Sequence, residues 1–175
     1  MVEKKIGDKT IRLVKGDITD MEVEAFVYDI TEDAKLSSGY GGAITVRGGP
    51  EIQKELDAIG SCPQGTAITT SGGNLKAARI VYINGPKFHE PQTEEKLRRA
   101  VKVALDKAEE EGLKQLAFPP VGTGLYQVPL ELCARVLLET VSKHLQGASK
   151  LQEVIFVALD TREYLPLQTS LQQGA

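Results

Sequence analysis

The sequence EAFVYDITEDAKLSSGYGG, residues 24–42, carries more information about the architecture than any other part of the chain. Residues 24–30 form a short, nearly continuous apolar run, which is typical of a buried strand. The polar loop that follows ends in glycines, as a phosphate-binding loop does, because glycine permits positive φ and close approach of the backbone to a ligand. The loop contains no histidine, no cysteine and no carboxylate beside its final glycines. It therefore indicates a ligand-holding loop with few groups for acid–base chemistry.

Apolar runs and helical patterns alternate along the rest of the chain. Further strands are predicted at residues 10–16, 65–71, 78–85, 114–122 and 153–160. Helices are predicted at residues 41–59, with a break at the sequence RGGP, and at residues 93–112 and 129–145. Thr93 is expected to be the N-cap of the second helix, and the C-terminal tail is expected to form a short helix or to fray. This order predicts an α/β protein with a mixed sheet between helices.

The composition is that of an ordinary globular protein. The chain has 175 residues, of which 41% are hydrophobic, so residues 1–175 are expected to form a single domain. The net charge of −3 provides no overall positive field, and we therefore do not expect nucleic acid as a partner. No apolar run is long enough for a membrane span or a signal sequence. We expect a cytoplasmic monomer that does not bind membranes.

The cysteines and histidines are too few for a metal site of the common kinds. Cys62 and Cys133 lie far apart in sequence and are expected to be reduced packing residues, which suits the cytosol. Only His89 and His144 can supply imidazole, which makes a histidine-rich metal site implausible. We expect neither a bound metal nor a cofactor.

A second glycine loop, PPVGTGLY at residues 119–126, also leaves a predicted strand and enters a predicted helix. In α/β sheets, ligands bind outside the carboxyl ends of the strands, where both loops are expected to lie. Two such loops facing each other suit a diphosphate better than a single phosphate. The alternative is that the glycines only form tight turns. Neither loop is a Walker loop or a Rossmann fingerprint.

Two further side chains belong to the same expected edge of the sheet. Asp17 follows the first predicted strand, and its carboxylate is suited to accept a hydrogen bond from an exocyclic amine such as N6 of adenine. The alternative for Asp17 is a helix cap or an Asx-turn. Tyr126 lies in the second loop, where an aromatic ring can pack on a sugar, or where it is simply a tyrosine at the edge of the core.

Taken together, these motifs resemble the macro domain, the ADP-ribose-binding module, over nearly the whole chain. The sequence LVKGDITDMEVEAFV is similar to the opening strand, GDIT turn and second strand of the family. The sequences GGAITVRGGPEIQKEL and CPQGTAITTSGGNLKAARIVYINGP are similar to its first helix and the course that follows. The sequence LAFPPVGTGLYQVP resembles its second phosphate loop. The resemblance implies a three-layer α/β/α sandwich with a mixed, mostly parallel sheet, and an ADP-ribose cleft across the strand ends.

The resemblance also implies a set of ligand-binding residues. It places Asp17 on the adenine N6, with the backbone of Ile18 nearby. The first loop, from Gly39 through Tyr40 and Gly41 to Gly42, would face the diphosphate and the distal ribose. The second loop would wrap the diphosphate from the other side with Gly122, Thr123, Gly124 and Leu125, and Tyr126 would pack beside the distal ribose.

The first loop departs from the pattern of the family's hydrolases. Counting without gaps, the second asparagine of the family's V-N-A-A-N falls on Thr31, and the aspartate of G-G-G-V-D falls on Gly41. Thr31 is shorter than asparagine and lacks its amide, whereas Gly41 can do no acid–base work. Ser37 and Ser38 replace glycines and are expected either to bond phosphate or to narrow the site, and Tyr40 can fill the distal-ribose space.

A second branch of the family uses a lysine and an aspartate, which fall here on Thr45 and Tyr126. Lys35 is either a displaced cation or, as an ordinary alternative, a solvated loop lysine. After the last strand, Leu159 stands where an aromatic residue often stacks on adenine, and Tyr164 is the nearest substitute. Because leucine offers no π-stacking, the affinity for adenine is expected to be reduced.

Three functional hypotheses follow from these residues. The first is binding of ADP-ribose or ADP-ribosylated protein with little or no hydrolysis. The second is a weak hydrolase of ADP-ribosyl esters, O-acetyl-ADP-ribose or ADP-ribose 1″-phosphate, for which the loop carboxylates Asp29 and Asp33 are the candidates. The alternative for Asp29 is that it points to the far side or caps a turn. The third is a degenerate scaffold that binds another nucleotide or none. No catalytic residue is assigned from the sequence.

Overall fold

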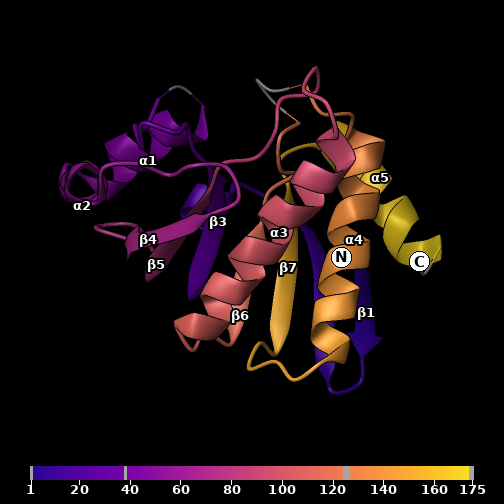
Figure 1. The fold of residues 1–175 in the computed structure, drawn as a ribbon. Coiled ribbons are helices and arrows are strands. Elements are labelled where there is room, and N and C mark those ends of the chain that lie inside the picture. The colour runs from indigo at the N-terminus through magenta and orange to yellow at the C-terminus, as the bar shows by residue number, and fades with distance from the viewer. Residues whose placement is uncertain (1, 38, 124–126, 174–175) are drawn as a thin grey trace.

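The computed structural model describes residues 2–37, 39–123 and 127–173. Within these residues, seven strands form one sheet in the order β1-β2-β7-β6-β3-β5-β4 (Figure 1). The strands are β1 (Val2–Ile6), β2 (Lys9–Lys15), β3 (Ala25–Asp29), β4 (Ala67–Ser71), β5 (Arg79–Ile83), β6 (Gln115–Phe118) and β7 (Glu153–Ala158). The five inner strands are parallel to their neighbours, and β1 and β4 are antiparallel edges. The prediction of a mixed, mostly parallel sheet is confirmed.

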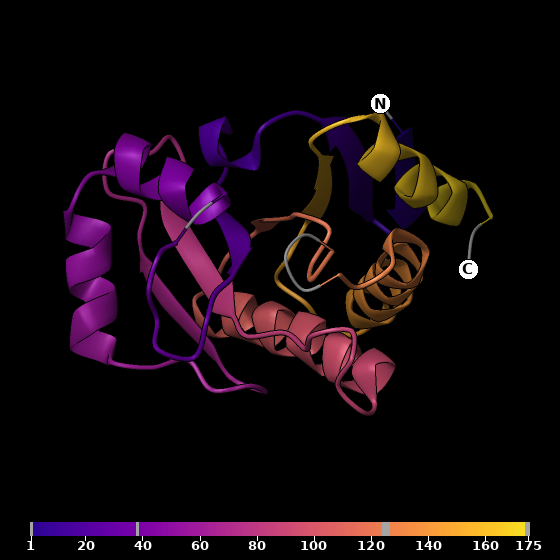
Figure 2. The ribbon, with the colours of Figure 1, turned by 90° about the horizontal axis from the view of Figure 1, so that it is seen from above.

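Helices cover both faces of this sheet, as Figure 2 shows from above. The described α-helices are α1 (Tyr40–Gly48), α2 (Glu51–Ile59), α3 (Thr93–Glu110), α4 (Leu130–Gln146) and α5 (Thr161–Gln173), and a short 3-10 helix, η1, spans Ile18–Asp20. One core layer lies between the sheet and the helices α3, α4 and α5, and a second lies between the sheet and the helices α1 and α2. The three-layer α/β/α architecture is therefore confirmed.

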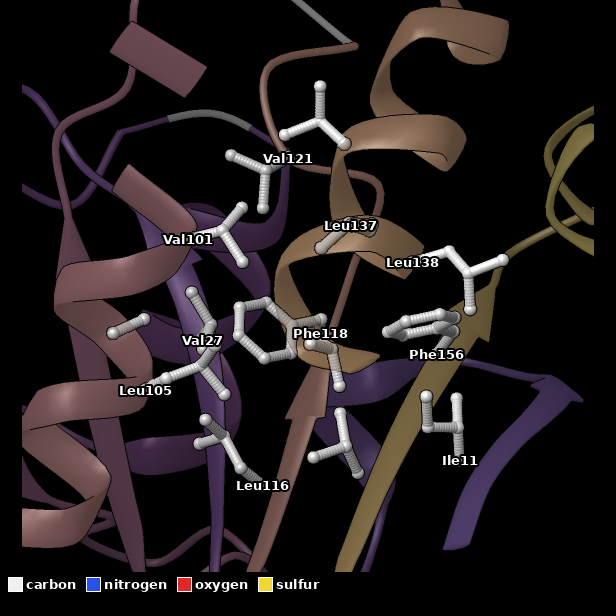
Figure 3. Packing of buried hydrophobic residues seen from close by; sticks show 14 of the residues in the cluster. Ile11, Val27, Val101, Leu105, Leu116, Phe118, Val121, Leu137, Leu138 and Phe156 are labelled. Carbon is white, nitrogen blue, oxygen red and sulfur yellow. The ribbon is translucent and has the colours of Figure 1, made fainter. Parts of the chain in front are cut away.

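The larger core, between the sheet and the helices α3, α4 and α5, explains why the sequences of the central strands are apolar runs. Phe118 of β6 and Phe156 of β7 are almost completely buried and pack among Val101 of α3, Leu137 of α4 and neighbouring aliphatic residues (Figure 3). Both faces of these strands are covered by helices, so hydrophobic side chains are required on both sides rather than in alternation.

The parallel arrangement brings four chain segments to the same edge of the sheet. The carboxyl ends of β2, β3, β6 and β7 lead, respectively, to Asp17, to the first glycine loop, to the second glycine loop and to Leu159. This is the edge at which α/β proteins bind ligands, because loops there can vary while the strands hold them in place.

The structure differs from the sequence-based expectations in two places. The strand β1 was not predicted, since its residues alternate between half-buried and exposed positions and are rich in charge. Thr93 was expected to be an N-cap, and this was wrong. The cap position belongs to Gln92, while the Thr93 hydroxyl donates to the carbonyl oxygens of Phe88 and Glu90. The C-terminal tail does form a helix, α5.

Among the described residues, no helix is both long enough and apolar enough to cross a membrane.

Candidate binding site at the carboxyl edge of the sheet

The first glycine loop ends in the N-terminus of α1. Gly39 is the N-cap of α1. Its φ of +67° is a backbone conformation that residues with a Cβ rarely adopt. The first helical hydrogen bond runs from the Ala43 N–H to the Gly39 carbonyl, so the preceding N–H groups have no partner within the helix. No acidic residue lies in this first turn. The N-terminus of α1 therefore offers an anion both backbone N–H donors and the positive pole of the helix dipole.

Tyr28 fills the space beside Gly41. A Cβ atom added to Gly41 would lie only 2.6 Å from the Tyr28 hydroxyl oxygen, which is closer than real Cβ contacts. Burial raises the pKa of Tyr28, although hydrogen bonds from the Ser37 side chain and from the Gly41 backbone act in the opposite direction. One backbone donor of the α1 terminus is thus engaged by a side chain of β3. Sequence reasoning missed this pairing, because nothing in the loop's spacing shows where Tyr28 points.

Three further polar side chains of the first loop bond one another or α2. Thr31 donates its hydroxyl hydrogen to the carboxylate of Asp33. Lys35 forms an ion pair with Asp57 of α2 at 2.6 Å, and both side chains are exposed. Gly42 has room for a Cβ, with the Ser37 carbonyl oxygen 3.5 Å away. Lys35 therefore has a structural partner in the described protein.

The second glycine loop begins with a tight turn. Gly122 has a φ of +77°, and a Cβ there would lie 3.0 Å from Val128. Thr123 donates its hydroxyl to the Pro120 carbonyl at 2.9 Å, which closes the turn. The predicted ligand contacts Gly124, Leu125 and Tyr126 lie outside the described residues.

Asp17 is held as a fixed acceptor at the end of β2. It caps η1, and its Oδ1 accepts hydrogen bonds from the Thr19 N–H at 2.9 Å and from the Thr19 hydroxyl at 2.7 Å. Its Oδ2 accepts from Arg47 at 2.8 Å. Partial burial raises the pKa of Asp17, but the hydrogen bonds from Thr19 and Arg47 outweigh it and hold that pKa below its usual value. The neighbouring Ile18 side chain is buried.

Tyr40 and Glu163 lie on the same side of the site as Asp17. Burial raises the pKa of Tyr40 to about 12, and the nearby carboxylates of Glu163, Asp17 and Asp160 add to the effect. The Tyr40 hydroxyl is shielded from solvent and has no hydrogen-bond partner among the described residues. Glu163, which the sequence analysis did not identify, accepts from the Leu159 N–H at 2.8 Å. It thereby holds the turn after β7.

The side chain of Leu159 is half exposed at this turn. Its apolar surface is open to solvent, and its contact with adenine stays a prediction. Tyr164 was named as the nearest substitute for that aromatic ring. The Lys15 ammonium group lies 5.6 Å from the centroid of its ring, and Tyr164 packs against the larger core.

Asp29, at the end of β3, points to the opposite face of the sheet from Tyr28, since successive side chains alternate. Its Oδ1 accepts from the Gly85 N–H at 2.9 Å. Its Oδ2 is shielded and has no hydrogen-bond partner in the described part of the chain. Burial raises the pKa of Asp29 to about 7, even though the Gly85 hydrogen bond lowers it. The described residues contain no group of three or more histidine, cysteine or acidic side chains that could hold a metal ion.

Comparison with known proteins places this geometry in one family. The macro domain family model matches residues 31–137. The chain is 39% identical to a macro domain-containing protein of Caldanaerobacter subterraneus, covering 88% of this chain and 91% of that protein. It is also 39% identical to a macro domain-containing protein of Listeria monocytogenes, covering 92% and 96% of the two chains.

Solved structures agree with the sequence comparisons. The Oceanobacillus iheyensis macrodomain with ADP matches with a TM-score of 0.93 and 28% identity, covering 98% of this chain and 95% of that one. The Trypanosoma brucei macrodomain in complex with ADP-ribose matches with a TM-score of 0.86 and 26% identity, covering 92% and 68%.

Proposed function

Because the chain belongs to the macro domain family, we propose that it binds ADP-ribose, free or attached to protein, at the carboxyl edge of its sheet, with little or no hydrolysis. The observation that carries this proposal is the convergence of two glycine loops and a fixed carboxylate, Asp17, on one edge of the sheet. Structural relatives with the same fold have been solved with ADP and with ADP-ribose.

Each part of the ligand has a chemically suitable place in this proposal. The adenine amine would donate to Asp17, with Ile18, Tyr40 and Leu159 as apolar surroundings. The diphosphate would lie between the N-terminus of α1 and the loop from Gly122 to Leu125, because backbone N–H groups neutralise phosphate charge. Thr31 and Tyr126 would border the distal ribose.

The expectation of little hydrolysis rests on the groups beside the distal ribose. Gly41 has no side chain, and the adjacent space is filled by the Tyr28 hydroxyl, whose raised pKa keeps it protonated at neutral pH. A neutral phenol is a poor general base. Thr31 is bonded to Asp33.

A weak hydrolase is the second candidate, and the specific observation that favours it is Asp29. This carboxyl group lies at the same edge, has a pKa of about 7 and has an unpaired, shielded oxygen. A pKa near neutrality is what a general base requires. Its orientation away from Tyr28 favours the binding function.

Isothermal titration with ADP-ribose tests the binding proposal, and a thermal-shift panel of ADP-ribose, ADP, AMP and NAD tests its selectivity. We expect ADP-ribose to bind and to raise the melting temperature most, since a ligand that binds only the native state stabilises it. No heat at high micromolar ADP-ribose would overturn the proposal, and stabilisation by another nucleotide alone would indicate a different ligand. Turnover of O-acetyl-ADP-ribose that is lost in Asp29→Asn would establish the hydrolase instead.

A further inference from the structure

Arg47 connects the two elements that border Asp17. It lies in the last turn of α1, and its Nη1 donates to Asp17 Oδ2 at 2.8 Å and to the Thr19 hydroxyl oxygen at 2.8 Å. The Thr19 hydroxyl in turn donates to Asp17 Oδ1. Three hydrogen bonds thus connect the three side chains in a closed network.

The network leaves Asp17 with capacity for one further donor. A carboxylate has about four acceptor positions, two on each oxygen. Oδ1 accepts from the Thr19 N–H and from the Thr19 hydroxyl, whereas Oδ2 accepts only from Arg47 among the described residues. The remaining position is therefore on Oδ2, directly beside the guanidinium group.

Arg47 also keeps unused donors. Its Nε and Nη2 have no hydrogen-bond partner among the described residues, and a guanidinium group carries five N–H donors in a fixed plane. The side chains of Arg47 and Asp17 are 45% and 34% exposed, so a ligand can reach both. The pair thus presents an acceptor and a donor side by side.

An acceptor beside a donor matches the edge of a 6-aminopurine. Adenine offers an amine hydrogen next to a ring nitrogen that accepts, and bidentate side chains recognise it in this manner. A 6-oxopurine presents an oxygen at the same place, which would face the Asp17 carboxylate with no hydrogen between them. The same edge chemistry therefore separates the two purine classes.

We infer that Arg47 is a specificity-determining residue that donates to a ring nitrogen of adenine while Asp17 accepts from the amine. This inference rests on the proposed function and adds to it a residue and a means of base selection. The ordinary alternative is an exposed ion pair that only joins α1 to η1, which contributes about 0–1 kcal/mol to stability and nothing to binding.

The test compares ADP-ribose with its hypoxanthine analogue, inosine diphosphate ribose, by isothermal titration of the wild type, Arg47→Met and Lys76→Met. Lys76 is the matched control, because it pairs with Asp20 of η1 at 3.2 Å and its loss changes the net charge equally. We expect wild type and Lys76→Met to prefer ADP-ribose. Arg47→Met should bind ADP-ribose about tenfold more weakly and lose most of the preference.

Two results with Arg47→Met would overturn the inference while leaving the proposed function intact. One is unchanged ADP-ribose affinity in Arg47→Met, and the other is an equal loss for both purines, which would indicate a general charge effect. Absence of ADP-ribose binding by the wild type would instead reject the proposed function itself. Arg47→Lys, which keeps the charge but not the planar fork, should fall between wild type and Arg47→Met, and equality with wild type in both affinity and preference would also contradict the inference.

Discussion

Tyr28 and Gly41 are complementary at the atomic scale, because the side chain of one occupies the space that a side chain on the other would need. The separation of 2.6 Å between the Tyr28 hydroxyl oxygen and a Cβ at position 41 requires one of them to move. The next nearest atoms, Tyr28 Cζ and the backbone carbonyl carbon of Leu36, both lie at 3.4 Å, which is close to ordinary contact. The hydroxyl is therefore the atom that excludes a side chain at this position.

This contact predicts a difference between two neighbouring glycines of α1. Gly41→Ala should lower the free energy of unfolding by about 1–3 kcal/mol, as overpacking does. In Gly42→Ala the added Cβ would meet, among the described residues, only the Ser37 carbonyl oxygen at 3.5 Å. This change should leave the free energy of unfolding unchanged or raise it by up to about 1 kcal/mol, because alanine favours helix. In a Tyr28→Phe background the cost of Gly41→Ala should largely disappear. Urea unfolding of the four variants measures the coupling, and a cost that persists without the hydroxyl would contradict this account.

Among the elements, the corner between α4 and β7 is tied to α3 by one carboxylate. Glu109 of α3 accepts from His144 Nε2 at 2.7 Å, from the Lys150 N–H at 2.8 Å and from the Ser149 hydroxyl. Burial raises the pKa of Glu109, but these hydrogen bonds outweigh it and hold that pKa below its usual value. This corner precedes β7 and therefore lies at the edge of the sheet opposite to the candidate site.

Because the corner and the site lie at opposite edges, we expect their effects to be separable. Glu109→Gln should lower the free energy of unfolding by about 1–3 kcal/mol, since it weakens hydrogen bonds from three residues of the corner. The affinity for ADP-ribose should not change. Asp106→Asn is the matched control on α3, because among the described residues Asp106 pairs only with Lys102, in an exposed ion pair, and its loss should have little effect. A large loss of ADP-ribose affinity in Glu109→Gln would show that the corner is coupled to the site.

For the molecule as a whole, local patterns predicted the layers and the central strands but not the pairings across the site. The apolar runs predicted β3, β6 and β7 because burial on both faces demands apolar residues. The edge strand β1 is not buried on both faces, so it needs no continuous apolar run. Its charged residues therefore gave no strand pattern in the sequence. The Arg47–Asp17 ion pair joins residues 30 positions apart, and only the path of α1 brings them together. Spacing identified the loops and offered Asp17 as a helix cap, whereas the Arg47 partner of Asp17 and the contact of Tyr28 with Gly41 depend on tertiary structure.

The free energy of unfolding should depend on pH through one buried carboxyl group, that of Asp29. Asp29 has a pKa of about 7 in the folded protein, against the ordinary value of 3.8 that applies to the unfolded chain. The folded state thus holds a proton that the unfolded state releases between these two values. The contribution of Asp29 to stability is complete below about pH 4 and is lost as the pH rises through about 7.

Asp29→Asn removes this dependence and keeps an oxygen that can accept from the Gly85 N–H. The difference in unfolding free energy between the variant and the wild type should be smaller at pH 5 than at pH 8, because the folded wild type still holds the proton at pH 5. At pH 8 the variant should be the more stable by about 1–3 kcal/mol, because the wild type then keeps an unpaired charge in a shielded position. Urea unfolding at the two pH values, with Asp33→Asn as an exposed control from the same loop, measures the difference. A gap between Asp29→Asn and wild type that stays constant from pH 5 to pH 8 would mean that Asp29 is already ionised throughout this range. In that case the shielded Oδ2 of Asp29 must accept a hydrogen bond within the folded protein, because an ionised oxygen without a donor would raise the pKa.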